Sequence, residues 1–567
     1  MTAFASAIFS LTSLALAGPT LEGVEDADLH RDISQILETY TQTPSNGVEA
    51  WRQGQDSANE VTLYLRSKGY YGARVIPRVD DDLEVVIDIE IGPVYTVGTV
   101  EISTREDERA KAVASAAIPV EPGDPLEATA ILNAEGLGLA ALQTSGWPDA
   151  DTGFRRVIVD HARGDSEVVY DYRPGEYSIN GEVYLSAPGW RESFIRRLSP
   201  LEPGAPTSRD DLSAYQRALQ NLASVQSAEV LLTPAENDQT ARDIEVVLEP
   251  RKRHALEASL SYSTSEGAGT DNRWSRRNVY GGDETFSARL QLATLIQGVE
   301  SELLFPHWRR LHQDLKLSAG AKSENTDAYD QQEVFLAAHV TRRHVGPFTL
   351  GAGVRLDGSH LKDSEDERDF LSLELPLSAL YDTRDNPLNP DDGWNIGLLV
   401  TPVITTGGAG SGYVRFDTRA ASYWPLSDRV LAAARVRFGT IVGTSSFSIP
   451  ADHRFFAGGG GSARGYAYQE LSPKNAEGVP IGGRSVVEFN TELRWHLREK
   501  WGVVAFVDAA TTGDDTTPDM GELRYGIGMG LRYYLSFAPI RVDVAMPVDK
   551  RDGEDPFQVY FSLGQAF

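Results

Sequence analysis

The chain has 567 residues, of which 24% are charged and 41% are hydrophobic, and its formal net charge is −29. This length exceeds one compact core, so several domains are expected, and the acidic balance argues against a nucleic-acid partner because neutralising phosphates requires a basic face. The sequence contains no cysteine, which excludes a disulfide framework, a thiolate metal site and a thiol nucleophile.

The first predicted element is a secretory signal peptide over residues 1–17. Residues 1–20 carry no charged side chain, the stretch before Ala17 is largely apolar, and Ala15-Leu16-Ala17 supplies the small residues of a cleavage site. No Lys or Arg precedes the apolar stretch, which departs from the usual pattern, and a buried N-terminal helix is the alternative. No later uncharged apolar run reaches about eighteen residues, so no transmembrane helix is expected, whereas barrel strands leave only a weak hydropathy signal.

Three repeats follow this segment. The tripeptide Glu-Val-Val recurs at 84–86, 167–169 and 245–247, and the Glu-Pro-Gly segment at 121–125 is echoed at 202–206. The spacing of about 80 residues is longer than a solenoid repeat and suits a small domain. The repetition therefore predicts a series of similar domains.

Each repeat is expected to contain a strand, two helices and two further strands. In the first repeat, a helix around 60–68 ends at Gly69, a natural left-handed cap, and a strand starts after Tyr70. The order of helix, Gly-Tyr, strand and Glu-Val-Val resembles the POTRA domain, the polypeptide-transport-associated module, with unrelated α+β domains as the alternative. The predicted domains are POTRA 1 at 18–91, POTRA 2 at 92–174 and POTRA 3 at 175–253.

From residue 254 onward the sequence predicts only β structure. Alternating segments of about ten residues are separated by turn residues, and in the last segment every second residue from Val559 to Phe567 shares one face. Allowing about 20 residues per strand and turn, residues 254–567 predict a transmembrane antiparallel β-barrel of about 16 strands. A soluble β-sandwich is the alternative, but it would not account for the aromatic residues near strand ends, where an interfacial girdle belongs.

The strongest local motif lies in a loop of about 40 residues between barrel strands. Its centre, Arg464-Gly465-Tyr466, follows the glycine run at 458–461. Glycines adopt positive φ and let backbones pack closely, so an arginine flanked by them can be carried deep into a confined space. A phosphate-binding loop is the alternative, but the motif lacks the Gly-Lys-Ser/Thr ending and does not join a strand to a helix.

This motif resembles the Arg-Gly-Tyr/Phe loop of the superfamily that includes BamA, TamA and the two-partner secretion transporters, in which the loop folds back into the barrel lumen. The resemblance covers nearly the whole chain after residue 17. The chain departs from the family pattern at Ala463, where an aliphatic residue is usual, and at Ala510, where a glycine is usual. Further matches are Asp382–Pro387 with Gly393, Phe506–Asp508, Gly526–Tyr533 and Pro539–Asp543.

Three POTRA-like domains and one barrel resemble the TamA-type members most. The resemblance implies an insertase in the outer membrane, with its POTRA arm in the periplasm, that assembles autotransporters and other unfolded outer-membrane protein clients in the lipid together with a TamB-like inner-membrane-anchored partner. It implies no cofactor, no metal and no catalytic residue, and residues 443–447 lack the last glycine of a nucleophile elbow. A two-partner-secretion pore and a plain solute porin are the alternatives.

Arg464 is expected to pair with a carboxylate in the lumen. Asp508 is the predicted partner because it follows Phe506 by two residues on a strand whose alternation can turn it inward, and the family resemblance suggests the same pairing. Glu488 and Glu492 on the preceding strand are rival carboxylates. An arginine solvated in a polar pore is the remaining alternative.

The last predicted site is a lateral seam where the first barrel strand, at about 255–265, meets the last, at about 556–567. Gly564 is expected to weaken or kink the terminal strand there. Phe567 ends the chain after an alternating segment and resembles the outer-membrane assembly signal. A client strand could then pair with the opened edge inside the bilayer.

Overall fold

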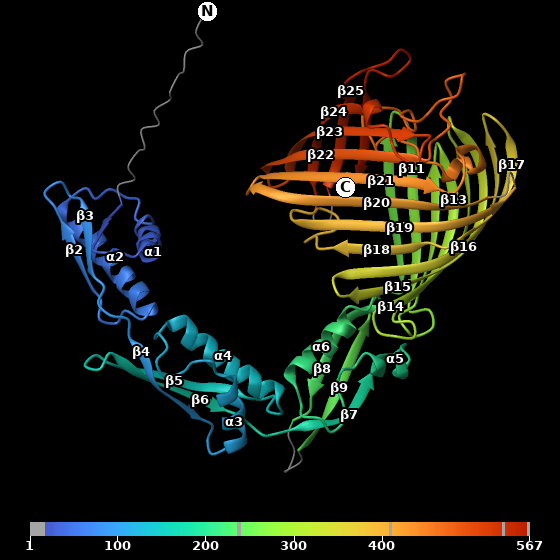
Figure 1. Ribbon diagram of the computed structural model, residues 1–567. Coiled ribbons are helices and arrows are strands. Elements are labelled where there is room, and N and C mark those ends of the chain that lie inside the picture. Colours follow the sequence, from blue (N-terminus) through green and yellow to red (C-terminus); the bar gives the residue numbers. More distant parts are fainter. Residues whose placement is uncertain (1–17, 235–239, 408–410, 536–538, 564–567) are drawn as a thin grey trace, which may run out of the picture. The chain divides into compact units, whose positions relative to one another are not determined.

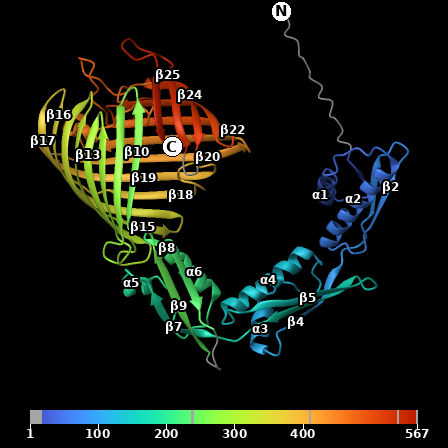
Figure 2. The same ribbon diagram turned by 180° about the vertical axis from the view of Figure 1, so that it is seen from behind.

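The computed structural model describes residues 18–234, 240–407, 411–535 and 539–563 (Figures 1 and 2). The chain forms two compact units. One holds the residues up to Ser186 together with 199–218 and 229–247, and the other holds 187–198, 219–228 and everything from Leu248 onward. No described helix is both long enough and apolar enough to cross a membrane.

Three small sheets account for the strands before the barrel. Their strand orders are β1-β3-β2, β4-β6-β5 and β7-β9-β8, and in each sheet the third strand along the chain is central and runs parallel to the first. The strands are β1 (Thr20–Glu22), β2 (Arg74–Val79), β3 (Val85–Glu90), β4 (Thr96–Ser103), β5 (Asp151–Asp160), β6 (Asp165–Arg173), β7 (Ile179–Ser186), β8 (Val225–Leu232) and β9 (Ala241–Pro250). The Glu-Val-Val repeat thus marks the central strand of each sheet.

Two helices accompany each sheet. They are α1 (Ala27–Leu37) and α2 (Gly47–Ser67), α3 (Glu108–Ala117) and α4 (Ala128–Thr144), and α5 (Glu192–Arg197) and α6 (Arg209–Gln220). The local sequence explains the bounds of α2: the side chain of Asn46 accepts hydrogen bonds from two backbone amides of its first turn, and Gly69 follows its end with φ +92°. Its apolar face, including Val61 and Leu65, packs on Ile87 of β3.

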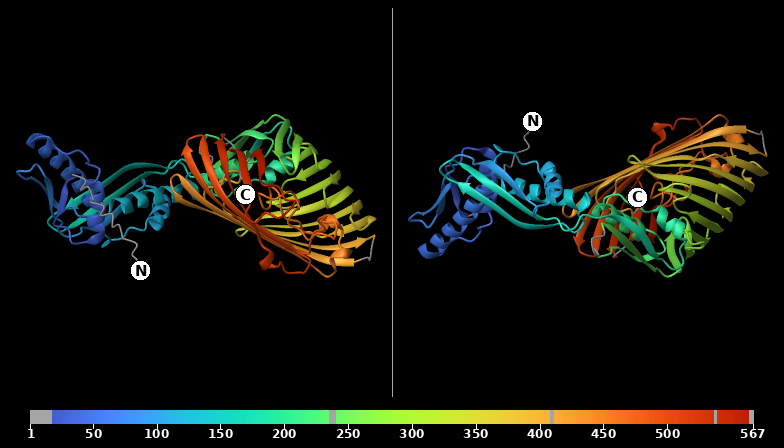
Figure 3. Two further views of the ribbon diagram at one scale, coloured as in Figure 1. Left: turned by 90° about the horizontal axis from the view of Figure 1, so that it is seen from above. Right: turned by 90° about the horizontal axis from the view of Figure 1, so that it is seen from below.

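The remaining strands form a closed antiparallel barrel (Figure 3). They are β10 (His254–Ser263), β11 (Gly267–Arg277), β12 (Thr285–Ala293), β13 (Ile296–Phe305), β14 (Gln313–Asn325), β15 (Tyr329–Val345), β16 (Phe348–Asp363), β17 (Glu367–Glu374), β18 (Leu377–Asp382), β19 (Gly393–Thr406), β20 (Ser411–Ser427), β21 (Val430–Val442), β22 (Ser485–Arg498), β23 (Trp501–Gly513), β24 (Arg524–Tyr534), β25 (Pro539–Pro547) and β26 (Gln558–Leu563).

The barrel has sixteen strands, because β17 and β18 are two halves of one strand that pairs with β16 on one side and β19 on the other. The interruption falls at Leu375-Pro376, where proline cannot donate a backbone hydrogen bond to the ladder. The predicted number of strands and the antiparallel closure are therefore confirmed.

Alternation along the strands separates an apolar outer face from a polar interior. On β24, Tyr525, Ile527 and Met529 are exposed, whereas Arg524 and Arg532 are buried. This pattern is typical of a barrel surrounded by lipid with a polar lumen.

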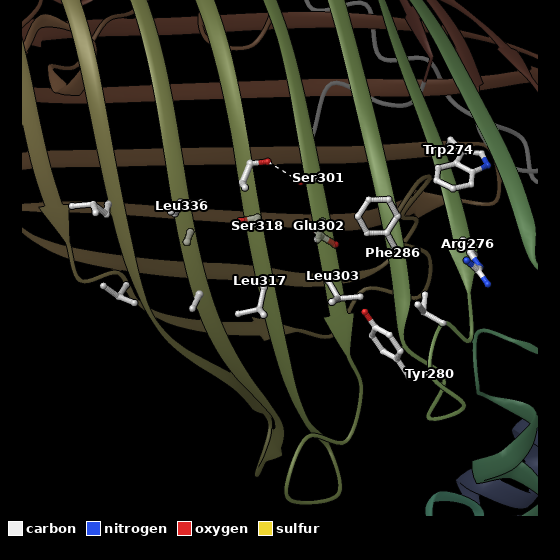
Figure 4. A pocket seen from close by; sticks show the side chains of 16 residues that line it. Trp274, Arg276, Tyr280, Phe286, Ser301, Glu302, Leu303, Leu317, Ser318 and Leu336 are labelled. Atoms are coloured by element: carbon white, nitrogen blue, oxygen red, sulfur yellow. Dashed lines mark hydrogen bonds between the residues drawn. The ribbon is translucent and has the colours of Figure 1, made fainter. Parts of the chain in front are cut away.

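One shallow outer concavity of about 780 Å³ near the end of β11 belongs to this apolar face (Figure 4); its large apolar side chains include Trp274, Phe286, Leu303, Leu317 and Leu336.

Several predictions concern residues outside the described ranges. The signal peptide at 1–17, Gly564 and Phe567 all lie outside them. The first barrel strand, expected at about 255–265, is His254–Ser263, and the described part of the last strand is Gln558–Leu563. The division of the arm into three POTRA domains remains a prediction.

We predict that a fragment of residues 18–174 folds without the barrel, since its two sheets each have their own apolar core. In that fragment, Leu65→Ala should lower the free energy of unfolding by about 2–5 kcal/mol, because Leu65 is fully buried. Leu63→Ala, on the same helix but 67% exposed, should change it by less than about 0.5 kcal/mol. Thermal and denaturant unfolding followed by circular dichroism would measure both. A fragment without a cooperative transition contradicts the prediction.

Candidate functional site

The long loop between β21 and β22, residues 443–484, packs inside the barrel. It contains two short 3₁₀ turns, η1 (Ser446–Ser448) and η2 (Ala451–His453). Its apolar residues form one cluster with inward-facing wall residues: Ile449, Phe455, Ala457, Ala463, Tyr466 and Leu471 pack with Val403, Tyr413, Ile441, Val486 and Ala510. Ala463 and Ala510, the two departures from the family pattern, are both completely buried in this cluster.

Arg464 is buried against the barrel wall, with 1% of its surface exposed. Its guanidinium donates to both carboxylate oxygens of Asp508, with Nε–Oδ2 at 2.7 Å and Nη2–Oδ1 at 2.9 Å. The backbone amide of Arg464 donates to the same carboxylate at 3.0 Å, and the guanidinium carbon lies 3.5 Å from the ring centroid of Phe506. The contact is bidentate and stacked, a geometry that lysine cannot reproduce.

Two more carboxylates complete the surroundings of Arg464. Its Nη1 donates to Glu492 at 2.7 Å and to Asp543 at 3.1 Å. The structure therefore brings the predicted partner, Asp508, and one of the two rival carboxylates, Glu492, to the same guanidinium. The other rival, Glu488, accepts from Arg437 and from Ser462 Oγ instead, at 3.0 and 2.8 Å, so it holds the part of the loop just before the motif.

Three wall arginines, to which the sequence analysis assigned no role, extend the cluster. Arg494 Nε donates to Glu492 at 2.9 Å, Arg532 pairs with Asp543, and Arg541 Nε lies 3.5 Å from the same Asp543 carboxylate. With Arg464 and Asp508, the described residues here comprise four buried guanidinium groups and three buried carboxylates. Removing one carboxylate would therefore leave buried cations without compensation.

Two glycines allow the loop to approach the wall. Gly465 has φ +101°, and a Cβ on it would lie 2.9 Å from the backbone carbonyl of Met546. On β24, a Cβ at Gly526 would overlap the carbonyl oxygen of Arg464. Glycine is thus needed on both sides of the contact, which explains its place in the Arg-Gly-Tyr motif and in the Gly-rich strand at 526–530.

Tyr466 fixes the end of the motif. Its hydroxyl donates to the backbone carbonyl of Tyr525 at 2.8 Å, and its ring lies 5.1 Å from the guanidinium carbon of Arg524. With 2% of its surface exposed, it belongs to the buried cluster of the loop. All three residues of the motif are therefore held by the barrel wall.

The loop also contacts both sides of the seam between β10 and β26. Within the described residues, this seam has two paired positions, Tyr262 with Phe561 and Ser263 with Tyr560, whereas β10 and β11 pair at ten. On the β26 side, the Tyr560 hydroxyl accepts from the backbone amide of Gly465 at 3.2 Å. On the β10 side, Glu266, just beyond the strand, accepts from the amide of Gly460 at 3.1 Å.

A cavity of about 400 Å³ lies at this seam and is lined by Tyr262, Tyr560 and Phe561 together with Gly460 and Gly461 of the loop.

A family model described as the Omp85 superfamily domain matches residues 278–567, which comprise about half of the chain and include the loop, the arginine cluster and the last strand. The chain belongs to the Omp85 superfamily. This membership agrees with the resemblance drawn from the Arg-Gly-Tyr loop at the level of the superfamily.

Two curated relatives are outer membrane protein assembly factors named BamA. The chain is 26% identical to that of Nitratidesulfovibrio vulgaris over 354 residues, 57% of this chain and 43% of the relative. It is 20% identical to that of Neisseria meningitidis serogroup B over 616 aligned positions, 93% of this chain and 74% of the relative. The chain therefore spans less than half the length of the first of these relatives.

A solved structure shows that the fold is shared. BamA from Haemophilus ducreyi lacking POTRA domains 1–3 superposes with a TM-score of 0.68 at 16% identity, over 83% of this chain and all of that one. A sixteen-strand barrel preceded by small α/β units is thus the architecture of this chain and of BamA-like Omp85 proteins.

We predict that Asp508→Asn, which keeps the shape but removes the charge, loosens the loop. The free energy of unfolding of the purified protein in detergent should fall by about 3 kcal/mol, because the buried arginines lose a counter-charge. Limited proteolysis should cut within 443–484 sooner. Asp552→Asn, in an exposed turn, is the matched control and should change neither result.

The double variant Arg464→Ala, Asp508→Ala should cost less than the sum of the two single variants, since the two side chains contact each other. Strictly additive losses would show that the pair does not hold the loop.

Proposed function

We propose that this chain is an outer-membrane insertase of the TamA type, which assembles autotransporters and other unfolded outer-membrane proteins together with a TamB-like partner. The observation that carries the proposal is the seam between β10 and β26, which has two paired positions within the described residues and which the lumen loop contacts from both sides. A seam with few paired positions can admit a client strand, while the rest of the ring stays closed by longer ladders.

The outer surface supports a membrane location. Outward-facing residues such as Leu256, Leu260 and Met529 are large, apolar and exposed, while charged side chains gather in the interior. A closed barrel satisfies its own backbone groups and can therefore span hydrocarbon. Together with the superfamily membership, this supports an outer-membrane barrel with residues 18–253 in the periplasm as POTRA domains 1 to 3.

The arm offers a way to receive clients. Each of its three sheets ends in strands that pair on one side only, such as β2 and β5. An extended polypeptide can add to such an edge by β-augmentation, with main-chain hydrogen bonds that do not depend on client sequence. Three such domains, fewer than in most BamA proteins and more than in two-partner transporters, favour a TamA-type protein and hence a TamB-like partner.

The seam would act by strand exchange. Opening β10 from β26 inside lipid leaves backbone groups unsatisfied, at a cost of several kcal/mol each. A client strand that pairs with the opened edge removes this cost, so the driving force is the client's own folding and the burial of its apolar face. No bond is made or broken, and the proposed activity involves no catalytic residue.

The loop makes the two sides of the seam unequal. On the β22 to β26 side it is held by the Arg464 cluster, by Tyr466 and by Tyr560. On the β10 side, the contact is the hydrogen bond between Gly460 and Glu266. We therefore infer that β10 moves during opening while the loop and β26 stay together.

We predict that a disulfide across the seam blocks client assembly. Tyr262→Cys with Phe561→Cys joins a paired, outward-facing position, and the absence of native cysteine makes the oxidised product unambiguous. The matched control is Leu256→Cys with Trp274→Cys, an outward-facing pair between β10 and β11. Insertion of an autotransporter into membranes containing each variant, with and without reductant, measures the effect.

The seam variant should lose activity when oxidised and regain it when reduced, while the control stays active throughout. Equal activity of the oxidised seam variant and the oxidised control would overturn lateral opening. Export of a soluble partner without insertion of any client would favour a two-partner-secretion pore instead.

We further predict that the protein purified from outer membranes retains a TamB-like protein. Solubilisation in mild detergent, affinity capture and mass spectrometry test this. The control is a variant lacking residues 18–91, the domain farthest from the barrel along the chain, which should capture less of the partner. Capture of BamA-type accessory proteins in place of a TamB-like protein would contradict the assignment.

A further inference from the structure

We propose that Asp357, Glu374 and His453 form a binding site for a divalent transition-metal cation such as Zn²⁺, which ties the lumen loop to the wall at β16 and β17. The site lies apart from the Arg464 cluster and does not depend on the proposed insertase activity. Asp357 is on β16, Glu374 ends β17, and His453 ends η2 in the loop.

The three side chains converge. One ligand atom from each lies within 4.8 Å of the others, and Nε2 of His453 is 3.5 Å from Glu374 Oε1. Asp357 is 3% exposed, and its Oδ1 has no hydrogen-bond partner among the described residues. Arg355 Nε lies 3.6 Å from this oxygen, beyond hydrogen-bond distance, so the oxygen keeps a lone pair that can bind a cation.

Tyr413 fixes the orientation of the His453 ring. Its Nδ1 shares a hydrogen bond with the hydroxyl of Tyr413, and the two rings meet edge to face with centroids 6.1 Å apart. This leaves Nε2 directed at the carboxylates. A histidine whose second nitrogen is fixed by a polar partner is the usual arrangement around a bound metal.

The local charge favours a cation. The network around the site contains the cations Arg355 and Lys322. Arg355 pairs with Glu333 and lies 3.6 Å from Asp357 and 3.9 Å from Glu374, and Lys322 lies 3.4 Å from Glu324.

Asp452, 3.6 Å from His453 Nε2, brings the carboxylates of this network to five among the described residues. With a neutral imidazole at His453, the form that binds a metal, Arg355, Lys322 and Arg415 face these five carboxylates, and a divalent ion would offset the remaining excess. Arg415 lines the same cavity but lies 3.8 Å from Asp417, which accepts from Arg437 as well.

The ligand types select the metal. One imidazole nitrogen and two carboxylates suit Zn²⁺ and similar ions, whereas Mg²⁺ and Ca²⁺ prefer oxygen ligands alone. Three protein ligands leave a coordination position for water. A cavity of about 380 Å³, lined by Glu374 and His453, lies beside the ligands and supplies room for that water.

A bound cation would give the loop a second anchor. Arg464 fixes one part of the loop to β22, β23 and β25, and the cation would fix His453 to β16 and β17. The metal would therefore set how firmly the loop closes the lumen.

Titration of the full-length protein in detergent micelles, without an affinity tag that binds metal, tests the site. Isothermal titration calorimetry with Zn²⁺ should show one site per chain, and His453→Ala and Glu374→Gln should each weaken binding at least about tenfold. His339→Ala is the matched control, because His339 lines the same cavity outside the triad. The heat-dependent shift in gel mobility checks that each barrel is folded.

Wild-type protein should also give visible absorption with Co²⁺, which Zn²⁺ abolishes, a result that needs no variant. Absence of a stoichiometric site, or equal losses in His453→Ala and His339→Ala, would overturn the proposal. Loss in His312→Ala instead would place the ion at the turn between β13 and β14, where the His307 and His312 rings lie 5.7 Å apart, and would also overturn it.

Discussion

The structure of the barrel interior depends on one guanidinium group. Arg464 is carried by a loop, yet it contacts carboxylates on β22, β23 and β25, so a single side chain ties three strands to the segment that fills the lumen. In this buried cluster three carboxylates face four guanidinium groups, so the loss of one carboxylate would leave further positive charge unpaired away from water. The close backbone contacts at Gly465 and Gly526 follow from the same requirement.

The loop connects the Arg464 cluster to the seam between β10 and β26. Gly465 follows Arg464 in the chain, and its backbone amide donates a hydrogen bond to the hydroxyl of Tyr560. The last strand is therefore connected to the cluster through one residue. On the side of the first strand, the contact described at the seam is the hydrogen bond from the amide of Gly460 to Glu266, just beyond β10. If the barrel opens laterally as proposed, this difference favours release on the β10 side.

Much of the fold could be predicted because its signals are local. Period-two alternation and turn spacing gave the number of strands, and the Glu-Val-Val repeat lies on the central strand of every small sheet. The juxtaposition of Arg464 and Asp508 followed from a family motif. Arg532 and Asp543 lie in segments that match the family, but their place in the cluster was not predicted, because Asp543 is 79 residues from Arg464 and only the register of β24 and β25 brings it there. His453 likewise meets Glu374 through the path of an irregular loop.

The strand break at Pro376 has a mechanical consequence. Counting from β10, the interrupted strand is the eighth of sixteen, so it lies halfway around the ring from the seam. Next to it, the amide of Leu375 donates to the carbonyl of Pro402 on β19, and Pro402 has no backbone N–H to donate in return. A ring cannot widen at one joint without flexing elsewhere, and flexing is easiest where the ladder is thinnest. In the proposed lateral opening, the break at Leu375-Pro376 would be the place opposite the seam where the ring bends.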